Sequence, residues 1–185
     1  MPHQMPLPGI DLPVPVAPPV TPTADKAALR DYPHVPSDVL CHHAKQIGGA
    51  GEALFDSLVM RHGLDSLAMP ESAAFDRMLL VGDLSVRVQI KTSSVLDGRA
   101  YAFTMSKGYH GSPQGVRGYA VGDYDLAACV ILPANAVWVT AEKREAYRVD
   151  ITAIPGLAAN PFASLRRALA DLGAAPGRGP RICDA

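Results

Sequence analysis

Residues 74–92 constrain the fold most, because they read as two strands joined by a tight turn. Gly82-Asp83 is a pair typical of two-residue hairpin loops, and hydrophobic residues alternate on both sides of it. A turn centred on this pair places Asp76 directly opposite Gln89, with Lys91 next on the same face of the strand. The sequence therefore predicts that an acid, an amide and an ammonium group meet on one patch of sheet.

Two interpretations of this hairpin stay open at the level of pattern. In the first, Gln89 and Lys91 are ordinary solvated residues on the outer face of a one-sided antiparallel hairpin. In the second, they belong to a functional site. In both, Val86, Val88 and Ile90 point into a core on the opposite face.

Length and composition exclude several classes of protein. A chain of 185 residues is long enough for one domain plus tails. The net charge of −1 argues against a strong non-specific nucleic-acid binder but leaves local basic patches open. Three widely spaced cysteines match neither a disulfide framework nor a zinc site, so we expect a cytoplasmic protein. We also expect no membrane association, because no apolar run is long enough to cross a bilayer.

The chain divides into three parts by composition. Residues 1–36 hold more than half of the seventeen prolines and are predicted to be a disordered tail, with docking to a protein partner as the alternative. Residues 37–172 read as the globular domain. Residues 173–185, rich in Gly, Pro and Arg, are predicted to be a flexible tail.

Within the domain, the pattern predicts a first helix, a series of strands and a last helix. Ser37 is the expected N-cap of a helix that runs to about His62, with Gly63 as its stop and internal glycines that either split it or mark a close approach. Asn160-Pro161 opens a last helix to about Leu172. The expected strands are 67–70, the hairpin, 99–106, the apolar run 126–132, and a further pair at 136–140 and 147–152.

Several of these residues, taken in order, resemble a known family. Gly48-x-x-Gly51-Glu52 on a helix, Asp76 on a strand and Gln89-Ile90-Lys91 on the next strand resemble the PD-(D/E)xK nuclease superfamily. The resemblance is to its branch of Holliday-junction-resolvase-like and group I intron-associated endonucleases, in a QxK variant. It spans roughly residues 48–140 and implies an α/β fold with a restriction-endonuclease-like core, a central mixed β-sheet flanked by helices.

The resemblance also implies an activity, that of a Mg²⁺-dependent endodeoxyribonuclease that hydrolyses DNA phosphodiester bonds, with Mn²⁺ able to substitute. By the resemblance, Asp76, Gln89 and the Ile90 carbonyl would hold the metal ion, and Glu52 would bind it or accept a proton. Lys91 would orient the attacking water and offset growing negative charge. Because Asp76 and Glu52 are its only two acids, the site is expected to bind one metal ion and not two.

The chain departs from the family pattern in ways that matter. Gln89 stands where a second acid is usual, and its oxygen brings no charge to a metal ion. No helix is expected between Lys91 and Leu126, where the family has a crossover. The alternative hypothesis is therefore a catalytically inactive relative that acts as a nucleic-acid-binding or protein-interaction module.

Residues in and just before the glycine-rich stretch 108–122 are further candidates for functional roles. Lys107, Tyr109 and Arg117 place cations beside an aromatic ring, as suits a phosphate backbone, although a solvated loop is the equal alternative. Asp125 is a candidate either for the site or for bonding nearby backbone. DNA is the expected partner, and a homodimer is a further expectation from the family.

Overall fold

The computed structural model describes residues 29–108, 111, 113 and 115–174. Its helices are η1 (Leu29–Asp31), α2 (Ser37–His42), α3 (Ala44–Arg61), η2 (Leu132–Ala134), η3 (Ile151–Ala153), α4 (Ile154–Ala159) and α5 (Ala163–Asp171). Its strands are β1 (Asp65–Ala68), β2 (Arg77–Val81), β3 (Leu84–Ser93), β4 (Leu96–Asp97), β5 (Ala100–Thr104), β6 (Ser106–Lys107), β7 (Arg117–Gly118), β8 (Leu126–Ile131), β9 (Ala136–Thr140) and β10 (Ala146–Asp150).

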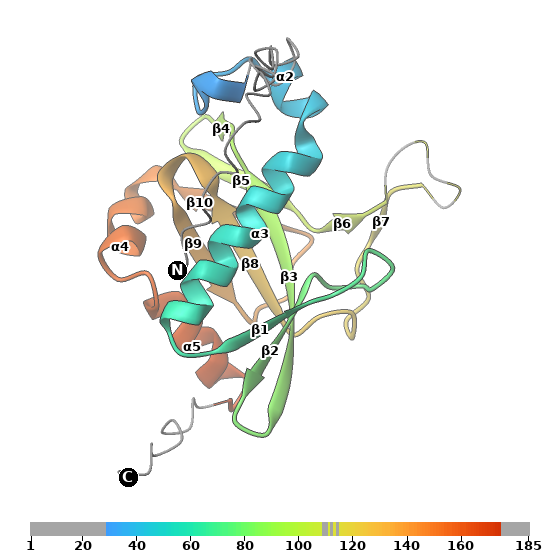
Figure 1. The fold of residues 1–185 in the computed structure, drawn as a ribbon, viewed down its shortest axis with the longest axis vertical. Coiled ribbons are helices and arrows are strands. Elements are labelled where there is room, and N and C mark those ends of the chain that lie inside the picture. The colour runs from blue at the N-terminus through green and yellow to red at the C-terminus, as the bar shows by residue number, and fades with distance from the viewer. Residues whose placement is uncertain (1–28, 109–110, 112, 114, 175–185) are drawn as a thin grey trace, which may run out of the picture.

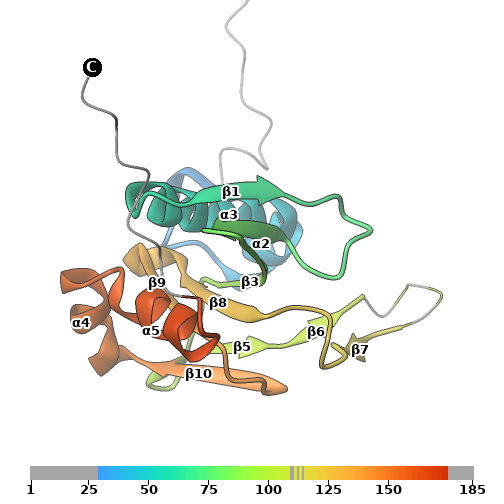
Figure 2. The same cartoon turned by 90° about the horizontal axis from the view of Figure 1, so that it is seen from below.

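The largest sheet of the described residues has five strands in the order β1-β2-β3-β8-β9. The pair β3 and β8 is parallel, and the other neighbours are antiparallel. This sheet confirms the predicted α/β class with a central mixed sheet flanked by helices. Figure 2 shows α3 on one face of it and the strands β5 and β10 on the other.

Strands β2 and β3 form the predicted hairpin in the predicted register. Val81 pairs with Leu84 next to the turn, and the pairing continues to Arg77 opposite Val88. Gly82 in the turn has a φ of +60°, a left-handed conformation that glycine adopts at little cost. The turn chemistry therefore fixes which residues of the two strands face each other.

Strand β8 is buried along its whole length because both of its faces are covered. Leu126, Ala128 and Val130 join the core under α3 and α5. Cys129 and Ile131 join a second core, which includes Phe103 of β5. The continuous apolar run of this strand thus reflects a sheet with cores on both sides.

The first predicted helix is divided in two. The break falls at His43, between α2 and α3, and not at the glycines. Ser37 is the first residue of α2 and follows Pro36, so the predicted Ser37 cap is wrong. Gly63 has a φ of +76° just after the end of α3, as expected of a helix stop.

Gly51 explains why α3 lies so close to β3. A Cβ atom at this position would overlap the Thr92 side chain, whereas nothing lies near a Cβ built at Gly48 or Gly49. Phe55, on the turn that follows, is fully buried against the sheet. The small residue allows the helix to approach the strand next to Lys91.

The predicted pairing of 136–140 with 147–152 is wrong. β9 pairs with β8 in the main sheet, whereas β10 pairs with β5 in a separate sheet of order β10-β5-β4. The cause is the second core, which draws Tyr147 of β10 toward Phe103. Helix α4, which precedes the predicted last helix, was not predicted from the sequence.

The segment between Lys91 and Leu126 contains strands and, among its described residues, no helix, in line with the prediction. β6 and β7 form a two-stranded ribbon that extends away from the main sheet (Figure 1). None of the helices in the described ranges combines the length and apolar character needed to cross a membrane.

The predicted tails, residues 1–36 and 173–185, lie mostly outside the described residues. Residues 29–36 are described and contain η1. The Tyr32 hydroxyl makes a hydrogen bond of 3.1 Å with the Ser94 hydroxyl, so this part of the predicted tail contacts the domain.

Candidate functional site

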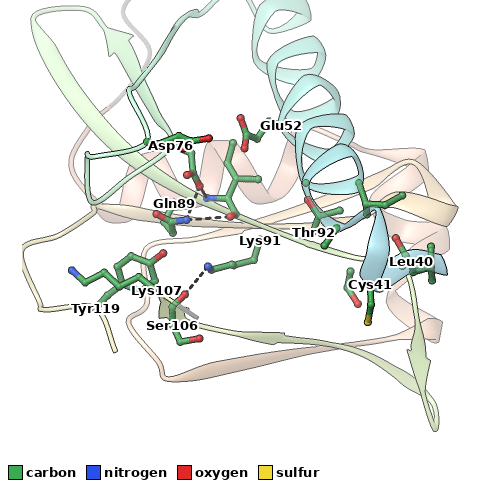
Figure 3. Close-up of a pocket in the computed structure, with 18 of the residues that line it drawn as sticks. Leu40, Cys41, Glu52, Asp76, Gln89, Lys91, Thr92, Ser106, Lys107 and Tyr119 are labelled. Carbon is green, nitrogen blue, oxygen red and sulfur yellow. Dashed lines mark hydrogen bonds between the residues drawn. The ribbon is translucent and has the colours of Figure 1, made fainter. Parts of the chain in front are cut away.

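A cleft of about 630 Å³ lies between α3, the end of β3 and the β6–β7 ribbon. It brings together all five residues predicted to form the metal and catalytic site. Figure 3 shows four of them, Glu52, Asp76, Gln89 and Lys91, around the cleft. The five residues are Glu52 of α3, Asp76 just before β2, and Gln89, Ile90 and Lys91 of β3.

Asp76 is held against β3 by its backbone and its side chain. Its N–H donates to the Val88 carbonyl, and its Oδ2 accepts hydrogen bonds from Gln89 Nε2 at 2.6 Å and Ile90 N at 2.7 Å. Burial raises the pKa of Asp76, and the negative charge of Glu52 raises it further, against the lowering effect of the Ile90 N–H bond. A carboxylate in this setting gains from a nearby cation.

Gln89 is buried and turns its amide NH₂ group toward two oxygens. Besides Asp76, Nε2 donates to the Ile90 carbonyl oxygen at 3.2 Å. The NH₂ group thus lies between the carboxylate and the carbonyl that the resemblance assigns to a metal ion. The amide has to turn for its own oxygen to join them.

Glu52 is held in place by Arg77, a residue outside the predicted site. Arg77 Nη1 lies 3.0 Å from Glu52 Oε2 and donates to the Asp76 carbonyl at 2.9 Å. The same guanidinium binds both carboxylate oxygens of Asp56, with Nε 2.9 Å from Oδ1 and Nη2 3.0 Å from Oδ2. Arg77 thus aims one acid into the cleft and anchors itself on another.

A signal for Arg77 was present in the sequence. It occupies the same face of β2 as Leu79 and Val81, the core face, where a charged residue needs partners. Two acids one turn apart on a helix, Glu52 and Asp56, supply them. The pattern becomes visible once α3 is known to cover this face of the sheet.

Lys91 points into the cleft, where its ammonium group donates to the Ser106 carbonyl oxygen at 2.7 Å. It also lies 5.4 Å from the centre of the Tyr119 ring. Burial lowers the pKa of Lys91, while the negative charge of Asp76 raises it. The lysine shares the cavity with Asp76, and its resting partner is the β6–β7 ribbon.

The structure places the residues predicted to contact nucleic acid, and the further candidate Asp125, in different settings. Lys107 of β6 lines the same cleft and forms an ion pair with Asp123. Arg117 of β7 is exposed on the ribbon. Tyr109 lies outside the described residues. Asp125 is held by Arg87, whose backbone N–H and guanidinium both donate to it, and therefore has a structural role.

The donor set of the cleft suits one hard cation by its chemistry. Two carboxylates and a backbone carbonyl are oxygen ligands, which Mg²⁺ prefers, and the Gln89 amide oxygen would join them only if the amide turned. Across the described ranges there is no group of three or more His, Cys, Asp or Glu side chains that could hold a metal ion. A cation held here would have Glu52 and Asp76 as its charged ligands, with Gln89 and the Ile90 carbonyl as uncharged ones.

Comparisons with known proteins relate this chain to an endonuclease by fold. No family model matches the sequence, and no curated protein matches it. Among solved structures, the chain is similar to a bacterial homing endonuclease, I-Ssp6803I, with a TM-score of 0.50 and 14% sequence identity. The likeness covers 57% of this chain and 76% of the other. It shows a fold shared with a nuclease.

Proposed function

We propose that this protein is a metal-dependent endonuclease of the PD-(D/E)xK type that hydrolyses phosphodiester bonds in DNA. The observation that carries the proposal is the convergence of Glu52, Asp76, Gln89 and Lys91 on one cleft. The fold shared with a homing endonuclease supports it, since the name of that protein describes an enzyme that cleaves nucleic acid.

Each residue has a distinct task in this proposal. Asp76, Gln89, the Ile90 carbonyl and Glu52 would hold a Mg²⁺ ion, or Mn²⁺ in its place. A bound cation of this kind polarises the phosphate and makes water more acidic. Lys91 donates hydrogen bonds to the attacking water or the phosphate, and its positive charge offsets the charge that develops there. As the alternative to holding the ion, Glu52 would accept a proton from the water, in a position fixed by Arg77.

Lys91 has three N–H donors, of which the Ser106 carbonyl uses one, and the others can serve this task. Its ammonium group donates to the Ser106 carbonyl in the absence of substrate, and a phosphate in the cleft offers a charged acceptor in place of a neutral one. The bond to the carbonyl is charge-assisted by its donor alone, whereas in a bond to a phosphate both the donor and the acceptor are charged, which makes it stronger. Substrate binding therefore favours the movement of Lys91 from the ribbon to the phosphate.

The second candidate function is that of a catalytically inactive relative that binds nucleic acid or a protein partner. The orientation of Gln89 favours it, because the amide NH₂ group satisfies Asp76 and Ile90 without a cation. The two candidates differ in whether DNA is cut or only bound. A homodimer and a protein partner for residues 1–36 remain predictions.

Cleavage of plasmid and branched DNA in Mg²⁺ or Mn²⁺ separates the two candidates. We expect the wild-type protein to cut DNA and both Asp76→Ala and Lys91→Ala to lose at least about a hundredfold in rate. Asp97→Ala is the matched control, because Asp97 forms an exposed ion pair with Arg148 and does not line the cleft. DNA binding without cleavage in either metal supports the inactive relative.

A further inference from the structure

Tyr119 forms part of the wall of the cleft, and none of the roles above involves it. It follows strand β7 and lines the cavity together with Asp76, Gln89 and Lys91. Figure 3 shows its ring next to Lys107, with the hydroxyl oxygen on the side of Gln89 and Lys91. A tyrosine hydroxyl is therefore available where the proposed reaction takes place.

Three contacts fix the Tyr119 ring, and all of them use the ring itself. Tyr124, which is buried, packs edge-on at a centroid distance of 5.3 Å and an interplanar angle of 88°. The ammonium groups of Lys91 and Lys107 lie 5.4 Å and 5.3 Å from the ring centre. Contacts of a cation with an aromatic face are attractive, so the ring orientation is well supported.

The Tyr119 hydroxyl has no hydrogen-bond partner among the described residues. Two other tyrosines in the described part of the chain do have one. Tyr147 donates to the Glu142 carbonyl, and Tyr32 bonds Ser94. Tyrosine hydroxyls in partly buried positions usually have a partner. A hydroxyl that faces a cleft without one is free to donate to a ligand.

The charges around the cleft indicate what kind of ligand group it would meet. Glu52 and Asp76 line one part of the cavity, while Lys91, Lys107 and the Tyr119 hydroxyl line another. Burial and the negative charge of Asp76 raise the pKa of Tyr119, so the phenol keeps its proton and stays a donor. A protonated donor beside Lys91 suits an anionic oxygen, such as that of a phosphate, whereas the charge of Lys107 is already paired with Asp123.

We propose that the Tyr119 hydroxyl is a catalytic group that donates a hydrogen bond to a non-bridging oxygen of the scissile phosphate. This inference rests on the proposed nuclease function. The phenol keeps its proton throughout, and its contribution grows as negative charge accumulates on the phosphate oxygens during attack. Lys91 and Tyr119 would thus hold the phosphate from the side opposite the acids.

Tyr119→Phe tests this role with a minimal change. The variant keeps the ring, its contact with Tyr124 and both cation contacts, and loses only the hydroxyl. Under single-turnover conditions with saturating protein, we expect its cleavage rate to fall about ten- to a hundredfold. Tyr101→Phe is the matched control, because Tyr101 of β5 does not line the cleft. We expect the control to cut at the wild-type rate and both variants to melt at the wild-type temperature.

Equilibrium binding of a short DNA duplex in Ca²⁺ provides a second measurement, which does not depend on cleavage. We expect Tyr119→Phe to weaken binding about two- to tenfold, the range for one lost hydrogen bond, and Tyr101→Phe to have no effect. A wild-type rate for Tyr119→Phe overturns the role of the hydroxyl. If the wild-type protein shows no cleavage that depends on Asp76, the nuclease proposal fails. In that case, DNA binding by Tyr119→Phe that equals binding by the wild type overturns the phosphate contact as well.

Discussion

Gln89 donates its side-chain amide to the Asp76 carboxylate over 2.6 Å, and the same NH₂ group reaches the Ile90 carbonyl. The amide therefore occupies the position in which a cation would join these two oxygens. Together with the Ile90 N–H, this donor stabilises a buried carboxylate next to Glu52. Under the proposed function, Gln89 is therefore the residue whose substitution would alter the binding of a metal ion.

Gln89→Glu should make the folded state depend on a divalent cation. Without metal, two carboxyl groups this close in a buried site cannot both stay ionised, so one of them has to hold a proton. The loss of the amide donor alone costs about 1–3 kcal/mol. We expect the melting temperature to fall by about 2–4 °C per kcal/mol and to recover on addition of Mg²⁺. Differential scanning calorimetry with and without Mg²⁺ measures both effects.

Gln89→Met serves as the control for this prediction. Methionine has a similar size and no donor, so its melting temperature should fall without recovering in Mg²⁺. Equal responses of the Glu and Met variants to Mg²⁺ would show that no cation binds between Asp76 and Ile90.

Arg77→Met should destabilise the protein strongly. The change leaves Glu52 and Asp56 without their partner in a partly buried setting, and breaking a buried ion pair costs about 3–5 kcal/mol. We expect a loss at the low end of this range, because about a quarter of the Asp56 side chain remains exposed to solvent. Urea denaturation measures the free energy of unfolding. Arg148→Met, which breaks an exposed pair, should change it by less than about 1 kcal/mol.

Gly51→Ala and Gly49→Ala should have opposite effects, although both lie in α3. Alanine at Gly51 overlaps the Thr92 side chain, and overpacking of this kind costs about 1–3 kcal/mol. Alanine at Gly49 meets nothing and should stabilise the helix by up to about 1 kcal/mol. Chemical denaturation of both variants measures the difference. A double variant with Thr92→Ala should recover much of the Gly51→Ala loss, and failure to recover would place the strain elsewhere.

His62 should make the protein less stable in mild acid. Burial lowers the pKa of His62 from its ordinary value of 6.5, and the positive charge of Arg166 lowers it further. Below pH 6.5 the unfolded chain therefore binds a proton that the folded chain does not, and the free energy of unfolding falls as the pH drops toward the folded pKa. Above pH 6.5 both states carry a neutral ring, so His62 adds no pH dependence there.

Urea midpoints between about pH 8 and pH 5 measure this slope. His62→Phe retains a ring that stacks on Phe162 and removes the titrating group, so its slope in the acid range should be smaller. Identical slopes for the wild type and the variant would assign the acid sensitivity to other groups.

The hairpin could be predicted from the sequence because its determinants are local. A two-residue turn and alternating hydrophobic residues fix the pairing of β2 and β3, and with it the meeting of Asp76 and Gln89. The buried strand β8 was equally visible as a continuous apolar run. Both features depend on residues close together in the chain.

Features that depend on distant residues were missed or misread. The partner of β10 is set by the second core on β5, more than forty residues earlier in the chain. The burial of Arg77 depends on its ion pairs with two acids on α3. Tyr119 lines the cleft because the β6–β7 ribbon carries it there. Sequence pattern identifies such residues as charged or aromatic but does not say which side chains they meet.

The most direct test of the central claim is the rate at which the purified protein nicks supercoiled plasmid in Mg²⁺, compared with Asp76→Ala and the surface control Asp97→Ala. We predict cleavage by the wild type and by Asp97→Ala, and at least about a hundredfold less by Asp76→Ala. Equal rates for Asp76→Ala and the wild type, or no cleavage by any of the three proteins, would contradict the assignment of this cleft as a nuclease active site.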